Sequence, residues 1–409
     1  MGKVTRSSYA VLIASTIAHF FNHIYTGALS PFLPIIRDEL SLTLTEAGIV
    51  TSAAVVTMTV SHLVVGYLGD KGWRDIFIPA SILLAAAIML VSSFATTFLF
   101  LTSAMLLLGV GASGYHPSVF PALAERFPKT SRATATGIQA IGGLVGMAVI
   151  PFLGVTLLVI LGGWRESFVL LSIAGFALFV PVTALMAYSR KGHSKEERSH
   201  EEGDGSDGWT RNFALLVVLM ALRGMSFRCT TLLMPLYLVE SEYSYDPILA
   251  GSFTTVMLVA GLVGEIVSAP LSDRVGRRVP FLVVSTGVST PFLLLLNASL
   301  SQVALLLVLI GIGFFFFLGV PPNTAFQTEV VPRQSQGLAF GLLFSIGAIP
   351  GALSPIVFGW IGDVYGLPMS IVFLVVTTGL ATVFAVLLKE AKDSKGDTPI
   401  ALDLIRVPD

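Results

Sequence analysis

The sequence predicts an all-α integral membrane protein whose twelve transmembrane helices form two six-helix bundles, with the N- and C-termini cytoplasmic. Three observations predict this class. The chain has 409 residues and is 54% hydrophobic but only 12% charged, whereas soluble domains are about 25% charged. Its apolar residues gather in runs of roughly 20, which suffice for a helix to cross a bilayer about 30 Å thick. One long polar insertion divides these runs into two groups of six.

The twelve apolar runs follow one another with mostly short connections. They cover residues 9–36, 46–69, 75–96, 98–124, 132–160, 164–187, 211–239, 247–270, 278–298, 300–328, 333–362 and 366–388. With a cytoplasmic N-terminus, all but four of the 24 Lys and Arg residues fall on the cytoplasmic side, as the positive-inside rule requires. Arg37 and Arg165 lie in outer loops, and Arg223 and Arg228 lie within a span.

The polar insertion, Ser189–Gly208, is charged and lacks large apolar residues. It cannot form a core, so we expect a disordered cytoplasmic tether. The predicted domains are an N-terminal bundle at 1–188, a linker at 189–210, a C-terminal bundle at 211–390 and a cytoplasmic tail at 391–409.

A matching charged loop follows the second span of each half. "GYLGDKGWR" (66–74) and "PLSDRVGRR" (270–278) each place an acid at the end of a span, then a glycine turn and basic residues. Such charges can pair with a basic loop or a helix N-terminus, hold the two bundles together and release them when this side opens. Ordinary loop charge is the alternative interpretation. The candidate gate residues are Asp70, Lys71, Arg74, Asp273, Arg274, Gly276, Arg277 and Arg278.

A polar stripe runs along the first span. His19, Asn22 and His23 lie on one face of the helix, followed one turn later by Thr26. Lipid cannot satisfy these groups, so the stripe should face the bundle interior or a watery cavity. Because the unperturbed pKa of histidine is about 6.5, we predict that His19 or His23 binds substrate or relays a proton.

Two further histidines lie inside spans. His116 stands beside Pro117 in a glycine-rich, kinked fourth span and is a third candidate for the transport path. His62 is alone in the second span, where a neutral, hydrogen-bonded histidine between packed helices is the simpler interpretation. That structural alternative also applies to the other histidines. A His-x-x-x-His pair can hold zinc, but neither a cysteine nor a nearby acid completes the site, so we predict no metal and no cofactor.

Arg223 and Arg228 are costly near the middle of the seventh span, at about 2.5 kcal/mol or more each. Five residues apart on a helix, they point about 140° away from each other, so one of them faces the cavity. A planar guanidinium suits carboxylate, phosphate or phosphonate, which predicts an anionic or zwitterionic substrate. Glu265, the only acid that lies away from the first residues of a span, is either the ion-pair partner of an arginine or a proton carrier.

Proline also interrupts the tenth span. Pro321 and Pro322 should break or bend the helix there, and Asn323 is the group expected to satisfy the freed backbone. Small residues at Gly142–Gly146 and Gly347–Pro355, in the fifth and eleventh spans, should let helices pack closely.

The loop motifs resemble the signature of the major facilitator superfamily, roughly G-x-x-x-D-R-x-G-R-R. The segments "AHFFNHIYTGALSPFLPIIRDEL", "VVGYLGDK" and "GASGYHPS" resemble the fosmidomycin-resistance-type efflux subgroup. The resemblance implies two bundles around a central site, and it places His19, Asn22 and His116 on the subgroup's motif positions, with Arg223 at its basic position. His23 and Ser118 stand where the subgroup has acids, which puts proton coupling in question.

The resemblance implies a secondary active transporter that expels a small organic anion or anionic drug by alternating access in exchange for protons. Uptake or exchange of a carboxylate or organophosphate metabolite without protons is the alternative. The polar residues form no nucleophile, base and orienter set, so an enzyme is not expected, and no basic patch suggests nucleic acid. We expect a monomeric, multi-pass protein of the plasma membrane (cell inner membrane) in contact with the lipid bilayer.

Overall fold

The computed structural model describes residues 4–191, 209–332, 339, 342–343 and 346–390. Most of the predicted tether and the whole predicted tail lie outside these residues. The regular structure of the described residues is helical, and it confirms the predicted all-α fold with twelve membrane-spanning segments.

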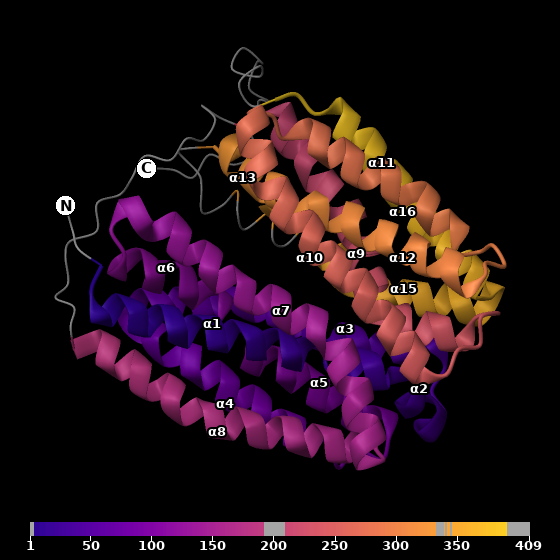
Figure 1. Ribbon diagram of the computed structural model, residues 1–409, viewed down its shortest axis with the longest axis horizontal. Helices are drawn as coiled ribbons and strands as arrows, with labels where there is room; N and C mark the ends of the chain where they lie inside the picture. Colours follow the sequence, from indigo (N-terminus) through magenta and orange to yellow (C-terminus); the bar gives the residue numbers. More distant parts are fainter. Residues whose placement is uncertain (1–3, 192–208, 333–338, 340–341, 344–345, 391–409) are drawn as a thin grey trace, which may run out of the picture. The chain divides into compact units, whose positions relative to one another are not determined.

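The N-terminal half contains the first six spans, of which the first and the fourth are each divided into two helices (Figure 1). A short π-helical turn, η1 (Gly69–Trp73), joins the second and third spans. The helices are α1 (Arg6–Gly27), α2 (Leu29–Leu40), α3 (Leu44–Leu68), α4 (Arg74–Ser92), α5 (Phe98–Ala112), α6 (His116–Arg126), α7 (Lys129–Leu161) and α8 (Trp164–Lys191).

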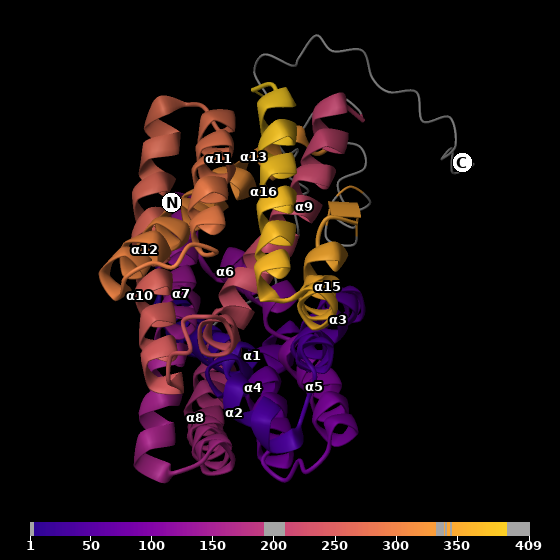
Figure 2. The same ribbon diagram turned by 90° about the vertical axis from the view of Figure 1, so that its right-hand side faces the viewer.

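The C-terminal half contains the other six spans. Its tenth span is divided like the fourth, whereas its seventh span is one helix (Figure 2). Its helices are α9 (Arg211–Glu240), α10 (Pro247–Val275), α11 (Val279–Leu295), α12 (Gln302–Leu318), α13 (Val320–Val330), α15 (Ile349–Tyr365) and α16 (Leu367–Leu387).

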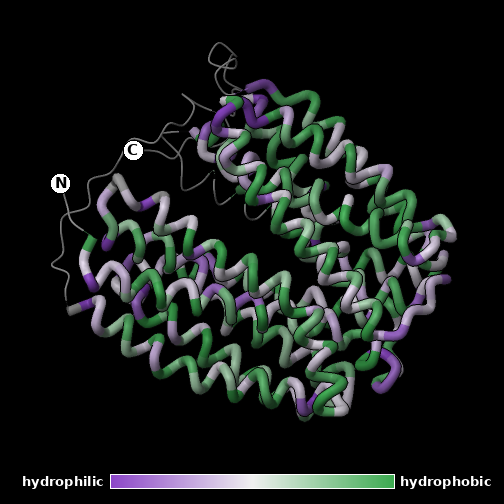
Figure 3. The backbone as a smooth tube through the Cα atoms, viewed as in Figure 1, coloured by the Kyte–Doolittle hydropathy of each residue, from purple (hydrophilic) through white to green (hydrophobic). Residues whose placement is uncertain are grey.

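The helix surfaces suit a lipid environment. Eight runs of described helix are long and apolar enough to cross a membrane, and one of them, Leu44–Ser92, contains both α3 and α4. Large apolar side chains such as Leu99, Ile160 and Val303 are 70–72% exposed on these helices. The helix centres are largely apolar, and polar segments gather at their ends (Figure 3). Exposed apolar side chains suit contact with lipid, and a helix is suited to a bilayer because it forms its backbone hydrogen bonds internally.

The chain forms two compact units. Unit 1 comprises residues 1–197, 231–255 and 355–367, so it contains the N-terminal half together with one end of α9, α10 and α15. Unit 2 comprises residues 198–230, 256–354 and 368–409.

Glycines allow the closest helix contacts in both units. In unit 1, a Cβ at Gly142 or Gly146 of α7 would lie 2.4–2.5 Å from a backbone oxygen of α1. In unit 2, a Cβ at Gly351 of α15 would lie 2.9 Å from the backbone of Gly224 in α9. These contacts agree with the close packing expected from the small residues of the fifth and eleventh spans.

Candidate functional site

Four histidines from three helices gather inside unit 1. The ring centroids of His19 and His23 on α1 lie 4.9 Å apart, and His116 at the start of α6 lies 5.3 Å from His19 and 5.9 Å from His23. His62 of α3 lies 6.0 Å from His116. The structure therefore brings together the three histidines that the sequence nominated, and it adds His62, for which an isolated structural role was the simpler interpretation.

His19 is held in place by residues that the sequence analysis did not single out. Its Nδ1 lies 3.0 Å from the backbone oxygen of Gln139 and 2.7 Å from the Gln139 side-chain nitrogen. The Gln139 side-chain nitrogen also donates to the hydroxyl of Tyr115, and that hydroxyl donates to the carbonyl of Ser15 at 2.8 Å. Tyr115 is fully buried and its ring stacks on His19 with centroids 4.9 Å apart. Gln139 was detectable as the lone amide in the apolar and small stretch "GIQAIGGLVG".

Asn22 satisfies the backbone at the break in the fourth span. It is 4% exposed, and its Nδ2 donates to the carbonyl of Ala112 at 2.9 Å. Ala112 is the last residue of α5, where the carbonyls have no partner within the helix. The described contact of Asn22 thus stabilises a helix end.

Arg223 makes the matching contact in unit 2. Its Nη2 donates to the carbonyl of Phe316, near the end of α12, at 2.7 Å, and Ser285 donates to the same oxygen at 3.3 Å. The prediction that Asn323 satisfies the freed backbone of this span was wrong, because Arg223 and Ser285 reach the Phe316 carbonyl, while the Asn323 Oδ1 is buried without a hydrogen-bond partner among the described residues. The guanidinium also lies 5.5 Å from the ring centroid of Phe227.

The two breaks are equivalent in the two halves. Ala112 and Phe316 are related by the same shift in numbering as Pro117 and Pro321, which stand in the first turns of α6 and α13. In each half, a polar side chain of the first span reaches the end of the first helix of the fourth. The N-terminal half uses a neutral amide, and the C-terminal half uses a cation.

Arg223 retains binding capacity after this contact. Its Nε is buried and has no hydrogen-bond partner among the described residues. Glu265 of α10 interacts with Arg223 electrostatically, but no N–O contact within 4.0 Å joins these two side chains. A direct Arg223–Glu265 ion pair, one of the two alternatives for Glu265, is therefore not formed. Arg228 is partly buried on α9.

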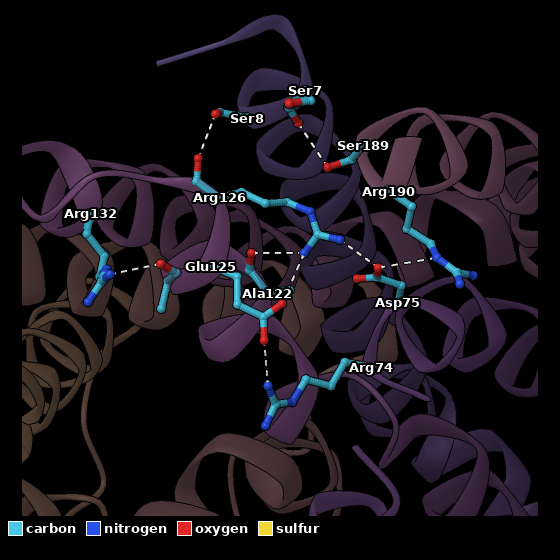
Figure 4. A network of polar contacts seen from close by, with 11 residues as sticks. Ser7, Ser8, Arg74, Asp75, Ala122, Glu125, Arg126, Arg132, Ser189 and Arg190 are labelled. Atoms are coloured by element: carbon cyan, nitrogen blue, oxygen red, sulfur yellow. Dashed lines mark hydrogen bonds and ion pairs between the residues drawn. The ribbon is translucent and has the colours of Figure 1, made fainter. Parts of the chain in front are cut away.

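Charged residues at the end of unit 1 where α1 begins form a network (Figure 4). Arg74 pairs with Asp70 and, at 2.7 Å, with Glu125 near the end of α6. Asp75 accepts from Arg126 at 2.6 Å. The sequence nominated Asp70 and Arg74 for a gate. Asp75, Glu125 and Arg126 were missed, because Glu125 lies 51 positions from Arg74 in the sequence and Arg126 lies 51 positions from Asp75.

Unit 2 contains an equivalent network. Arg278 pairs with Asp273 at 2.7 Å and with Glu329 at 3.1 Å. Arg278 and Glu329 are again 51 positions apart, and Glu329 occupies the same place in α13 as Glu125 in α6. The repeat therefore extends from the loop acid to the end of the fourth span of each half.

The other nominated loop residues have simpler surroundings. Lys71 lies 4.5 Å above the ring of Tyr67. Gly276 has φ +66°, a left-handed conformation that glycine adopts without strain. Arg274 and Arg277 are exposed and make no ion pair with the described residues.

We expect Asp75→Asn to lower the free energy of unfolding by about 3 kcal/mol, because the buried Arg126 then loses its closer carboxylate and keeps only Glu125 at 3.7 Å. The Arg126 side chain is only 4% exposed. Arg190 contacts the same Asp75 at 3.7 Å but is 59% exposed, so Arg190→Ala should cost less than about 1 kcal/mol. Denaturant unfolding of the purified variants measures both, and equal losses would contradict a buried pair.

At the end of unit 1 where α2 finishes, Asp363 of α15 binds the first turn of α3. Its carboxylate accepts from the backbone N–H groups of Leu44 and Thr45 at 2.9 and 2.8 Å and from the Thr45 hydroxyl. A helix N-terminus favours such an anion. Arg37 of α2 also pairs with Glu240 of α9 at 2.8 Å.

The Asp363 contact should depend on pH. Partial burial acts to raise the Asp363 pKa, but hydrogen bonds from Thr45 and the Leu44 backbone outweigh it and hold the pKa below its ordinary 3.8. A lowered pKa gives a stabilisation that is fully present well above 3.8 and is lost as the pH falls through the folded-state value. Asp363→Asn should therefore cost about 1 kcal/mol at pH 7. Wild type and variant should converge in unfolding midpoint only at strongly acid pH, and a difference independent of pH would contradict this account.

The family model described as Major Facilitator Superfamily matches residues 15–217 and again residues 216–406. The chain is 25% identical over 379 residues to a probable sulfoacetate transporter of Cupriavidus necator, covering 87% of each chain. It is 22% identical over 376 residues to the fosmidomycin resistance protein of Escherichia coli, covering 88% of this chain and 87% of that protein.

A solved structure has a similar fold. The chain matches a bacterial homolog of the human lysosomal transporter Spinster, in an inward-facing and occupied conformation, with a TM-score of 0.78 and 18% identity. The match covers 96% of this chain and 98% of the other.

Proposed function

The chain belongs to the Major Facilitator Superfamily, and we propose that this multi-pass membrane transporter moves small organic anions by alternating access with proton coupling. We further propose that it works as a monomer in the cell inner membrane and belongs to the fosmidomycin-resistance-type subgroup. The observation that carries the proposal is Arg223, a cation within α9 with a buried Nε that has no described partner. Its cost inside a membrane calls for a function.

Arg223 is suited to a carboxylate, sulfonate or phosphonate. A guanidinium offers several N–H donors in a fixed plane, and only Nη2 is used by the Phe316 carbonyl. An anion can therefore bind the remaining edge while the Phe316 contact fixes the side chain. The sulfoacetate transporter of Cupriavidus necator supports this substrate class, because sulfoacetate carries a sulfonate and a carboxylate.

Glu265 is the proposed proton carrier. It lies close enough to Arg223 for the two charges to interact, so an anion on Arg223 would repel the carboxylate and favour its protonation. By linkage, a proton on Glu265 raises the affinity of Arg223 for the anion by the same factor. His19, His23, His116 and Arg228 are proposed to take part in substrate binding or proton relay, and Asn22 is proposed to support the broken fourth span beside them.

The direction of net transport depends on whether proton and anion cross the membrane together or in opposite directions. The resemblance to the fosmidomycin-resistance-type efflux subgroup, with the fosmidomycin resistance protein of Escherichia coli among the relatives, supports efflux. The reciprocal effect of Arg223 and Glu265 instead favours movement of proton and anion together, which drives uptake. Uptake of a carboxylate metabolite is therefore the second candidate, and serine and histidine in place of the subgroup's acids at Ser118 and His23 keep proton-independent exchange open.

The two charged networks are proposed as the cytoplasmic gate. Each has an arginine at the start of a third span, Arg74 or Arg278, that joins a loop acid to a glutamate at the end of a fourth span. The gate would then open by exchanging the ion-pair partners of Arg74 and Arg278.

Uptake of labelled sulfoacetate and of labelled fosmidomycin into proteoliposomes tests the function. We expect saturable uptake of at least one anion that a pH gradient drives above equilibrium. Acid outside as the driving condition indicates cotransport, and acid inside indicates exchange with protons. Saturable exchange that no gradient affects would contradict proton coupling, and no uptake of either anion, or of a panel of small carboxylates, would contradict the anion assignment.

A further inference from the structure

We propose that His19, His23 and His116 form a binding site for a divalent transition-metal ion such as Zn²⁺. Each residue offers one ring nitrogen, and the three nitrogens lie within 4.8 Å of one another. The residues come from two helices, since His19 and His23 are one turn apart on α1 and His116 begins α6. The inference goes beyond anion transport, and it does not depend on the proposed substrate.

The separations are close to those of a metal site. Zn²⁺ binds histidine nitrogens at about 2.0–2.1 Å in tetrahedral geometry, which puts two bound nitrogens about 3.3 Å apart. Nitrogens within 4.8 Å reach that distance by small rotations of the side chains. The i, i+4 pair on α1 supplies two ligands on one helix face.

The surroundings of His19 suit a metal ligand. Metal-bound histidines commonly donate their second ring N–H to a backbone carbonyl or a carboxylate. The Nδ1 of His19 lies 3.0 Å from the backbone carbonyl of Gln139 and 2.7 Å from the Gln139 side-chain nitrogen. The tautomer that donates to the carbonyl leaves Nε2 as the ligand atom. Gly143 of α7 packs against the face of the His19 ring, where a Cβ would lie 2.4 Å from both Cε1 and Nε2, and this close packing holds the imidazole in position.

The ligand chemistry selects the kind of metal. Three neutral imidazoles favour Zn²⁺ and its transition-metal neighbours over Mg²⁺ and Ca²⁺, which prefer oxygen ligands. A site with three protein ligands keeps a fourth coordination position for water or an anion. The sequence argued against a metal because the pair on α1 lacked a third ligand, and the fold supplies it as His116 from the fourth span.

Titration calorimetry with Zn²⁺ tests the site in the full-length protein, purified in detergent through a tag without histidine. His193 and His200, which lie outside the described residues, are replaced by glutamine in every sample to remove competing imidazoles. We expect one Zn²⁺ per chain. His23→Gln and His116→Gln should each weaken binding at least about 10-fold, while Mg²⁺ gives no signal.

His62→Gln is the matched control. Its imidazole also lies inside unit 1 beside His116 but is not one of the three clustered ligands, so Zn²⁺ affinity should stay within about 3-fold, well short of the loss expected for a true ligand. Size-exclusion profiles and unfolding midpoints establish that each variant is folded, and His19→Gln provides a third ligand variant if one of the others is not. Absence of saturable Zn²⁺ binding in the parent, or an equal loss in His62→Gln, would overturn the proposal.

Discussion

Arg223→Ala should abolish anion transport while the protein still folds. The variant removes the cation proposed to bind the substrate, and losing one member of a buried charge pair costs about 2–5 kcal/mol, or roughly 30- to 4,000-fold in affinity. It also removes the hydrogen bond to the Phe316 carbonyl, which should lower stability by about 1–3 kcal/mol. Initial uptake rates over a range of anion concentrations measure the first effect, and unfolding midpoints measure the second.

Asn22→Ala separates these two effects. Asn22 makes the equivalent contact to Ala112 in the N-terminal half, but without a charge. If support of the broken span explains the loss in Arg223→Ala, Asn22→Ala should lose transport equally. If anion binding explains it, Asn22→Ala should lose stability and retain more transport. Arg223→Lys keeps the charge but not the planar fork, so its apparent KM should rise. Normal transport by Arg223→Ala would remove this residue from the binding site.

The sequence was sufficient for the fold because membrane spans carry a strong signal. Apolar runs and the side preference of basic residues predicted twelve spans, and the structure agrees. The breaks at Pro117 and Pro321 were also visible, since proline cannot continue the backbone bonding of a helix. The loop acids Asp70 and Asp273 stood out as charges beside long apolar segments.

The partners of these residues were not visible in the sequence. Helical periodicity shows which side chains share a face, but it does not show which other helix that face contacts. Asn22 was therefore expected to face the bundle interior or a cavity, but its contact with the end of α5 could not be predicted. Gln139 was missed for the same reason, because its significance depends on α7 lying against α1. Recognising Glu125 and Glu329 required knowledge that the third span of each half begins beside the end of the fourth.

Glu265→Gln should uncouple transport from the proton gradient. Glutamine keeps the shape of the side chain but cannot bind or release a proton, so the anion affinity of Arg223 should no longer depend on pH through this residue. We expect exchange of anion across proteoliposome membranes to continue at a rate near that of wild type. Accumulation driven by a pH gradient should fall to equal concentrations inside and outside.

The comparison of exchange with accumulation makes this result specific to coupling. A variant that only damaged the fold or the binding site would lose exchange as well, whereas loss of a proton carrier removes accumulation alone. Glu242→Gln is the matched control, because Glu242 is an exposed acid of the same half and should leave both measurements unchanged. If Glu265→Gln still concentrates the anion, the proton is carried elsewhere, and the histidines of α1 and α6 become the next residues to test. If both measurements fail in a folded variant, the carboxylate is required for orienting Arg223, and its electrostatic interaction with that arginine serves binding instead of coupling.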